Sequence, residues 1–348
     1  MALANGAPPP GRDLESWLRD ATSSAALAET VLAISRAAAE ISRMVRLGPL
    51  AGALGAEVGG ANADGDSQRQ LDVLANAAIV RALRGAPVAC LASEEEEEAL
   101  VLRPDGALAV AVDPLDGSSN IDTNTSIGTI FSIFPVAAGE ASASFLRKGA
   151  EQVGAGYAIY GPHTALALTL GAGTFLFVLD ADDVFRLAAM RPAIPRTTRE
   201  YAINASNYRY WLEPVRDFVD DCIAGVDGPR GKDFNMRWLA SLVGEMHRIL
   251  MRGGVFLYPA DKRPGYERGR LRMLYEAAPI AFLVEQAGGR ATDGVMRILD
   301  KAPSTLHERT PLIFGSADKV DHVVALHTDS TYARAPSPLF GRRGLFRA

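Results

Sequence analysis

The sequence predicts an α/β protein, organised as two domains or as one large unit of packed layers. Two kinds of segment support this fold class: stretches with an apolar residue every three or four positions, typical of amphipathic helices, and short valine-rich apolar runs, typical of buried strands. The chain has 348 residues, more than a single ordinary core accommodates. Glycine or proline marks the end of several of these segments.

The first part of the chain contains two predicted helices and then a series of strands. Residues 1–12 are rich in alanine, proline and glycine, and we expect them to be disordered. The apolar spacing predicts a helix over 28–47, a loop over the glycine- and aspartate-rich stretch 59–65, and a second helix that carries Leu71 to Leu83 on one face. Strands are expected at 88–92, 108–113, 126–134, 155–160, 164–170 and 174–179, the last two joined by a hairpin turn.

A proline- and arginine-rich stretch at 191–198 is the best candidate for a domain boundary. Beyond it we expect helices near 211–224, 236–252, 271–287 and 317–327, and strands at 254–258 and 311–315. The chain therefore divides into a partly disordered N-terminal segment, two α/β domains and a disordered tail, over 1–27, 28–195, 196–330 and 331–348. Residues 333–348 contain four arginines and no acid, which is typical of a solvated tail.

Composition excludes several classes of protein. Hydrophobic residues make up 48% and charged residues 22%, the balance of a soluble globular protein. No apolar run approaches the ~20 residues needed to cross a bilayer, and the N-terminus lacks the pattern of a secretory signal. The net charge of −5 argues against nucleic acid as a partner. Cys90 and Cys222 cannot form a disulfide framework, so we expect a cytoplasmic protein that binds neither membranes nor nucleic acid.

The most informative stretch runs from Asp113 to Asn120, directly after the apolar run Leu108 to Val112. A strand that ends in Asp113 delivers a carboxylate to the carboxyl edge of a sheet, where α/β proteins bind ligands. Pro114 forces a turn, and Asp116 then lies close enough to share a divalent cation with Asp113. The following Gly117, Ser118 and Ser119 offer close backbone approach, hydroxyl groups and N–H donors to a phosphate.

An alternative is that this stretch is an ordinary turn, because Asp-Pro and Asp-Gly are common turn dipeptides. The whole octapeptide behind a buried strand favours a site for metal-assisted phosphoryl chemistry instead. The five histidines show no metal-ligand spacing, so zinc is not expected. Any metal should be a hard cation with oxygen ligands, such as magnesium or manganese.

Further carboxylates have both a functional and a purely structural interpretation. Glu94 to Glu98 follow an apolar strand, and we interpret Glu94 and Glu95 as functional and the other three as solvated. Asp66 could simply cap the second helix, and Asp72 could be a surface residue beside the core.

Glu276 lies beside the apolar stripe of its predicted helix, where Arg270 or Arg272 could pair with it. Two or three clustered cations would need all of these carboxylates, because they could then polarise a phosphate, activate a water and neutralise a leaving alkoxide.

These motifs resemble those of class I fructose-1,6-bisphosphatase, a member of the lithium-sensitive, magnesium-dependent sugar-phosphatase superfamily. The resemblance covers residues 28–328. It is carried by Gly65-Asp66 with Leu71 to Leu74, Ser93 to Glu95, Asp113 to Asp122, Ser126 to Phe131, Gly253 to Pro259 and Leu271 to Gly289. The short Asp-Pro-x-Asp-Gly pattern belongs to the whole superfamily, whereas its extension through Ser-Ser-Asn-Ile-Asp is typical of the fructose bisphosphatase branch.

The resemblance implies a role for each motif residue and a magnesium cofactor, with manganese as a substitute. One magnesium would be held by Glu94, Asp113, Asp116 and Glu276, a second by Glu94, Asp113 and the Leu115 carbonyl, and a third, more weakly, by Asp66 and Glu94. Asp72 and Glu95 would polarise the attacking water. The 1-phosphate would be held by Asp116, Gly117, Ser118 and Ser119, and the 6-phosphate end by Asn204, Tyr208, Tyr258 and, from a neighbouring subunit, Arg237.

The resemblance also implies a homotetramer with a five-layer α/β/α/β/α fold. The first domain would carry the metal site and the second the substrate site. The sequence departs from the familiar animal pattern at Arg270, where a lysine contacts the sugar, and at Trp238, where a tyrosine is expected. Arginine keeps the charge as a planar fork, and tryptophan keeps the aromatic surface without the hydroxyl.

The expected reaction is hydrolysis of the 1-phosphate of fructose 1,6-bisphosphate to give fructose 6-phosphate. The nearest alternative is the same chemistry on sedoheptulose 1,7-bisphosphate, alone or as a second activity. An inositol-phosphate or nucleotide phosphatase is a more distant alternative, and a sugar-phosphate sensor without activity belongs to a different class. Both gluconeogenesis and carbon fixation use this reaction, and the sequence leaves the choice open.

Overall fold

The computed structural model describes residues 11–61, 67–188 and 191–329. Residues 1–10 of the stretch 1–12 predicted to be disordered, the tail and the predicted metal ligand Asp66 lie outside these ranges. Residues 11 and 12 are described and are ordered, because both form backbone hydrogen bonds with Leu187. Seven α-helices are present in the described part: α1 Leu14–Ala21, α2 Ala25–Leu47, α3 Gln70–Arg84, α4 Glu213–Ala224, α5 Leu242–Arg252, α6 Ala278–Gln286 and α7 Ala317–Thr328.

The strands of the described residues form two large sheets and two small ones. The first large sheet has the order β10-β9-β8-β7-β6-β5-β3-β4 and the second the order β12-β11-β13-β17-β15. The strand bounds are β1 Glu57–Ala61, β2 Ser67–Arg69, β3 Val88–Ser93, β4 Leu100–Val101, β5 Leu108–Asp116, β6 Ile127–Pro135, β7 Gly154–Tyr160, β8 Thr164–Thr169, β9 Thr174–Leu179, β10 Phe185–Leu187, β11 Glu200–Ala202, β12 Asn235–Met236, β13 Val255–Tyr258, β14 Leu271–Arg272, β15 Arg290–Thr292, β16 Arg309–Thr310 and β17 Leu312–Gly315.

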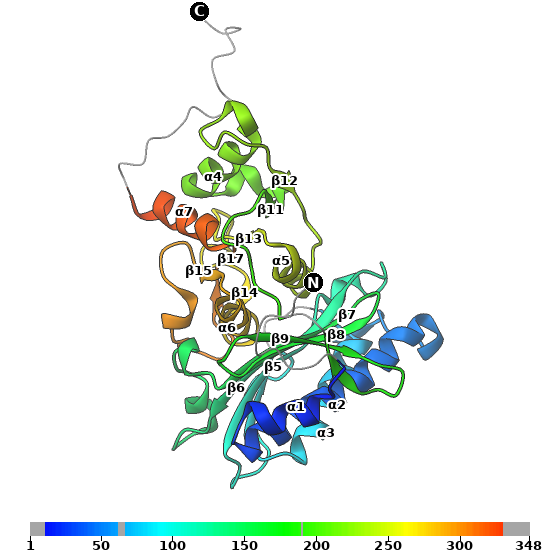
Figure 1. The fold of residues 1–348 in the computed structure, drawn as a ribbon. Coiled ribbons are helices and arrows are strands. Elements are labelled where there is room, and N and C mark those ends of the chain that lie inside the picture. The colour runs from blue at the N-terminus through cyan, green and yellow to red at the C-terminus, as the bar shows by residue number, and fades with distance from the viewer. Residues whose placement is uncertain (1–10, 62–66, 189–190, 330–348) are drawn as a thin grey trace, which may run out of the picture.

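Helices α1 to α3 cover one face of the first sheet (Figure 1). Because side chains alternate along a strand, Phe131 of β6 points toward these helices and packs in the same core as Ile34 and Ile79, whereas its neighbour Ile130 faces the other way. The first large sheet thus buries both of its faces.

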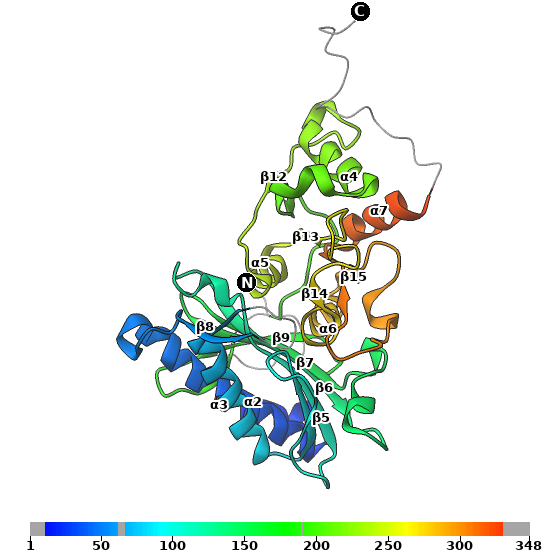
Figure 2. The ribbon, with the colours of Figure 1, turned by 180° about the vertical axis from the view of Figure 1, so that it is seen from behind.

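The other face of this sheet packs on α5 and α6, which in turn cover the second sheet (Figure 2). Ile130 of the first sheet, Met246 and Ile280 of the two helices, and Phe314 of β17 share this middle core. The far face of the second sheet is covered by α4 and α7. The layers therefore follow the order α/β/α/β/α, which confirms the predicted five-layer fold.

The structure corrects several element predictions. The helix expected over 236–252 starts only at Leu242, because residues 235–236 pair with β11 as strand β12. The helix expected over 271–287 begins with strand β14 and one π-helical turn, Met273–Ala277, before α6 starts. Helix α1 falls within the segment expected to be partly disordered, and β1 overlaps the start of the predicted loop at 59–65.

Two general features bear on the expectations from composition. No helix in the described ranges has both the length and the hydrophobicity to cross a membrane. Cys90 and Cys222 are buried and free. The middle core joins residues from both sides of the stretch 191–198, and the domain boundary there remains a prediction.

Candidate active site

Two parallel strands deliver the acidic residues to one edge of the first sheet. β3 and β5 pair in parallel, so their carboxyl ends lie side by side. Glu94 follows β3, and its N–H donates to the carbonyl of Val112 at 3.0 Å. The register of β5 against β6 shifts between Asp113 and Asp116, at the position of Pro114, which has no N–H to donate. This irregularity turns both aspartates toward the same cavity.

Three carboxylates from distant parts of the chain form a compact triad. Asp113, Asp116 and Glu276 are all buried, and one ligand oxygen of each lies within 4.8 Å of the others. Glu276 reaches the triad from the π-helical turn Met273–Ala277, a local geometry that often occurs at functional sites. Three buried carboxylate oxygens at this spacing fit one divalent cation with oxygen ligands.

The electrostatics of the triad support the same conclusion. Burial, together with the negative charges of neighbouring carboxylates, raises the pKa of Asp113 and of Glu276 well above the usual range. Burial raises the pKa of Asp116 to about 6, although N–H donors from Val243 and Leu242 act in the opposite direction. A bound cation would favour the ionised form of all three carboxylates.

The triad forms one wall of a cavity of about 360 Å³. This cavity brings together most of the predicted site: Asp72, Glu94, Glu95, Asp113, Leu115, Asp116, Gly117, Ser118, Ser119, Tyr258, Arg270 and Glu276. Carboxylates therefore face a loop of glycine and serine across a space the size of a small ligand.

Arg272 also lines the cavity. The sequence suggested that its side chain could pair with Glu276, but in the structure its side chain and its backbone contact two different carboxylates. Its guanidinium lies 3.3 Å from a carboxylate oxygen of Glu94. Its backbone N–H donates to Glu276 at 2.6 Å. Arg272 thus balances negative charge at the edge of the triad, and a cation bound by Glu94 would have to share that carboxylate with it.

Asp72 is a buried residue of the cavity and not the surface residue of the alternative interpretation. One of its oxygens accepts the backbone N–H of Arg69 at the start of α3, at 2.8 Å. The other, Oδ1, is buried and has no hydrogen-bond partner in the described part of the chain. Burial and, secondarily, the charge of Glu95 raise the pKa of Asp72 to about 6. An unpartnered carboxylate oxygen beside the triad is suited to bind a water molecule.

The rest of the glutamate run divides as expected, with one exception. Glu97 and Glu98 are exposed. Glu96, expected to be solvated, accepts a hydrogen bond from Asn76 of α3 at 2.7 Å. It therefore helps to attach the acidic loop to the first layer of helices.

The loop that follows Asp116 has the geometry of an anion cradle. Gly117 has a φ of +79°, in the left-handed region that glycine adopts without strain, and Ser118–Asn120 form a short 3-10 turn. The side chain of Asn120 donates to the carbonyl of Ala240 at 2.9 Å and ties this loop to the segment before α5. The N–H of Val243, in the first turn of α5, donates to Asp116 Oδ2 at 2.9 Å. The positive end of α5 therefore points at Asp116.

The residues predicted for the 6-phosphate end are only partly brought together. Tyr258 lines the main cavity and also a second, smaller one, which Asn204 and Trp238 line with it. Tyr208 lines neither of these cavities, because its hydroxyl donates to Asp220 of α4 at 2.9 Å. Its neighbour Asn207 lines the smaller cavity instead.

Arg270 reaches the main cavity from the loop between β13 and β14. Its guanidinium donates to the hydroxyl of Tyr266 at 2.6 Å and lies 5.0 Å from the centre of that ring. Arg263, which the sequence did not single out, lies 4.0 Å from the centre of the same ring and pairs with Asp261 in the smaller cavity. Its position between Tyr258 and Arg270 in the sequence is the only signal that could have indicated it.

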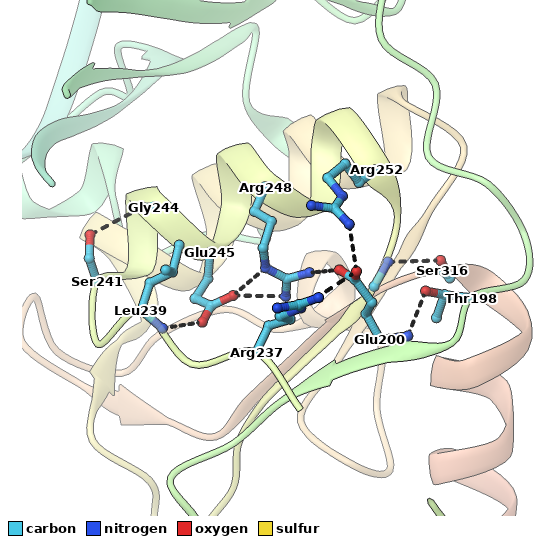
Figure 3. Close-up of polar contacts among 11 residues, drawn as sticks. Thr198, Glu200, Arg237, Leu239, Ser241, Gly244, Glu245, Arg248, Arg252 and Ser316 are labelled. Carbon is cyan, nitrogen blue, oxygen red and sulfur yellow. Dashed lines mark hydrogen bonds and ion pairs between the residues drawn. The ribbon is translucent and has the colours of Figure 1, made fainter. Parts of the chain in front are cut away.

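Arg237 lines neither cavity of its own chain. Its side chain is half-exposed and lies 3.7 Å from Glu200, as Figure 3 shows. The predicted role of Arg237 at a neighbouring subunit's site therefore stays a prediction.

Comparisons with known proteins give a consistent result. The model of the fructose-1,6-bisphosphatase N-terminal domain matches residues 14–188, and that of the C-terminal domain matches residues 194–328. A class 1 fructose-1,6-bisphosphatase of Rhodopseudomonas palustris (strain HaA2) is 56% identical over 337 residues, 97% of each chain. One of Paracoccus denitrificans (strain Pd 1222) is 58% identical over 91% of this chain and 94% of that protein.

A solved structure is similar over nearly its whole length. The fructose-1,6-bisphosphatase of Leishmania major in its holo form is 35% identical, with a TM-score of 0.86 over 92% of this chain and 99% of that one.

Proposed function

The chain belongs to the class I fructose-1,6-bisphosphatase family, and we propose on this basis that it hydrolyses the 1-phosphate of fructose 1,6-bisphosphate. The observation that carries the proposal is the buried triad of Asp113, Asp116 and Glu276 beside the Gly117–Ser119 loop. Hydrolysis of a phosphate ester requires a site for hard cations next to groups that bind the phosphate, and this cavity contains both.

The metal ligands of the proposed enzyme come from the triad and its neighbours. Asp113, Asp116 and Glu276 would hold one magnesium together with Glu94, and manganese would serve in its place. Glu94, Asp113 and the Leu115 carbonyl would hold a second magnesium, and Asp66 with Glu94 a third. When bound, these cations supply positive charge to the phosphate and to the leaving oxygen.

The chain's own residues position the reactants. Asp72 and Glu95 orient the attacking water and accept its proton, and the buried Oδ1 of Asp72, which has no hydrogen-bond partner among the described residues, is the oxygen suited to this role. Hydroxyl and N–H groups of Gly117, Ser118 and Ser119 hold the 1-phosphate on the line of attack.

Other residues hold the far end of the sugar bisphosphate. Asn204, Tyr258 and Arg270 bind the 6-phosphate end, with Asn207 at the position that Tyr208 was expected to fill. Arg237 completes the site of a neighbouring subunit in a homotetramer. The buried free cysteines suit a reducing compartment, and we place the enzyme in the cytoplasm.

Phosphate release measures the proposed function directly. With magnesium present, we expect the protein to release one phosphate from fructose 1,6-bisphosphate and little from an inositol phosphate or a nucleotide. Sedoheptulose 1,7-bisphosphate, assayed in parallel, tests the second activity. A protein that binds the bisphosphate and metal but releases no phosphate would be a sensor, and the proposal would be wrong.

Arg270 provides a test of the sugar-binding end. Arg270→Ala should raise KM for fructose 1,6-bisphosphate by about tenfold or more, because a charged hydrogen-bond donor to the substrate is lost. Arg270→Lys should lose much less, since it keeps the charge. Arg268→Ala, an exposed arginine two residues away, is the matched control and should leave KM unchanged. An unchanged KM in Arg270→Ala would show that Arg270 only stacks on Tyr266.

A further inference from the structure

A buried pair of charged residues, Glu245 and Arg248, lies on α5 and faces Glu200 (Figure 3). Glu245 has no exposed surface. One of its oxygens accepts the N–H of Leu239 at 2.7 Å, and the other accepts two hydrogen bonds from Arg248, at 3.0 and 2.8 Å. Arg248 also donates to Glu200 of β11 at 2.8 Å, so that it joins α5 to the second sheet.

Glu200 connects this pair to two further arginines. Its Oε1 accepts a hydrogen bond from Arg252 at 2.8 Å and lies 3.7 Å from Nε of Arg237. Arg237 has the longest contact with Glu200 of the three arginines, 3.7 Å against 2.8 Å for both Arg248 and Arg252, and its side chain is 50% exposed. Glu200 is therefore the acidic residue that Arg237 faces in this part of the structure.

The segment from Arg237 to Val243 lies between these charges and the catalytic cavity. The N–H of Arg237 donates to the carbonyl of Tyr201 at 2.7 Å, which fixes one end of the segment on β11. Within it, Ala240 has a φ of +55°, a left-handed conformation that costs energy for any residue with a Cβ. The other end donates the Val243 N–H to Asp116. A strained segment of this kind keeps its shape only where contacts on both sides hold it.

Those contacts come from opposite directions. On the cavity side, Asn120 donates to the Ala240 carbonyl. On the other side, Glu245 accepts the Leu239 N–H. Helix α5 does not need Glu245 for its own start, because Ser241 already caps it by accepting the N–H of Gly244. A buried ion pair is costly to desolvate, so its presence here points to a role in fixing the segment.

We infer that Glu245, Arg248 and Glu200 are positioning residues for the phosphatase reaction, which hold the segment 237–243 so that Val243 orients Asp116 and Arg237 is aimed outward. The inference rests on the proposed function, both of the triad and of Arg237 at a neighbouring subunit's site. From Asp116 the connection runs through the Val243 N–H and the backbone back to Leu239, and from there through Glu245, Arg248 and Glu200 to Arg237.

We expect substitutions of Glu200, which contacts Arg237, and of Glu245, which contacts the segment behind Asp116, to have different kinetic effects. Glu200→Gln releases Arg237, so we expect KM for fructose 1,6-bisphosphate to rise by about tenfold with kcat changed less than about threefold. Glu245→Gln loosens the segment behind Asp116, so we expect kcat to fall by about tenfold. Manganese affinity of Glu245→Gln, measured by calorimetry without substrate, should fall by a similar factor.

Glu285→Gln is the matched control, because Glu285 is a partly buried glutamate of α6 bonded to Arg297 and remote from the segment. It should keep wild-type kcat, KM and manganese affinity. Wild-type values in Glu200→Gln and Glu245→Gln, or equal losses in Glu285→Gln, would overturn the inference.

If Glu245→Gln fails to fold, a double-mutant cycle between Glu200→Gln and Arg237→Ala still tests whether Glu200 positions Arg237. Their effects on KM should be non-additive, and additive effects would show that Glu200 does not position Arg237. If the wild-type protein had no phosphatase activity, the proposed function would be wrong. The manganese affinity of Glu245→Gln would still show whether Glu245 holds the segment 237–243.

Discussion

Replacing Asp116 by Asn is expected to lower kcat by about three orders of magnitude, the loss that follows removal of a major electrostatic contribution to a transition state. The amide has the size of the carboxylate but no charge, and its NH₂ group cannot ligate a cation. Asp116 also accepts the Val243 N–H, so an amide oxygen that keeps this contact turns its NH₂ toward Asp113 and Glu276. In the opposite orientation the amide oxygen faces the triad without a negative charge, and the NH₂ group meets the Val243 N–H, donor against donor.

Folding of the Asp116→Asn variant should not suffer. In the metal-free protein the change removes one of three crowded negative charges, so the melting temperature without metal should equal or exceed that of the wild type. Asp105→Asn is the matched control, since Asp105 lies in the turn before the same strand with an exposed side chain paired with Arg103. Turnover of Asp116→Asn close to the wild-type value would contradict the proposed site.

Removal of divalent cations is expected to abolish phosphate release completely. Magnesium or manganese should restore it, and zinc should not be required, because the ligand set consists of oxygens. Activity that survives exhaustive chelation would rule out the metal mechanism.

Binding of the same cations should also change how the thermal stability of the protein depends on pH. The pKa of Asp72 and that of Asp116 are both raised to about 6, whereas carboxyl groups in an unfolded chain titrate near 4. Between these values the metal-free folded protein binds more protons than the unfolded chain. The contribution of these groups to stability is therefore greatest below about pH 4 and is lost as the pH rises through about 6.

A bound cation favours the ionised carboxylates and removes this loss. The increase in melting temperature caused by magnesium should consequently be larger at about pH 7.5 than at about pH 5.5. Thermal denaturation at both pH values, with and without magnesium, measures it. Asp116→Asn should show a smaller increase than the wild type, and an equal increase at the two pH values would contradict the linkage.

The sequence predicted those parts of the site that depend on local geometry. Asp113 and Asp116 lie in one octapeptide at the end of one strand, so their proximity follows from the chain itself. Glu276 is more than 150 residues away, and only the family resemblance connected it to them. The π-helical turn that presents it cannot be read from a periodicity that fits an ordinary helix equally well.

Short irregular elements account for most of the differences between the expected and the observed positions. Asn204 to Trp211 form a tight turn, in which successive side chains point about 120° apart. A shift of one residue therefore exchanges Asn207 for Tyr208 at the cavity, and pattern alone cannot decide between them. Strand β12 has only two residues, and its pairing with β11 depends on contacts that are distant in sequence.

The shared middle core has a consequence for how the polypeptide is made. Ile130 of the first sheet is covered by Ile280 of α6, so the sheet waits for about 150 more residues to be synthesised before this face is closed. At about 5–20 residues per second, that interval is roughly 8 to 30 seconds on the ribosome. During this time the nascent N-terminal half displays an apolar surface of strands, which is the kind of surface that chaperones bind and that aggregation begins from. We therefore expect the N-terminal half of the nascent chain to need protection from aggregation until α5 and α6, which cover this face, have been synthesised.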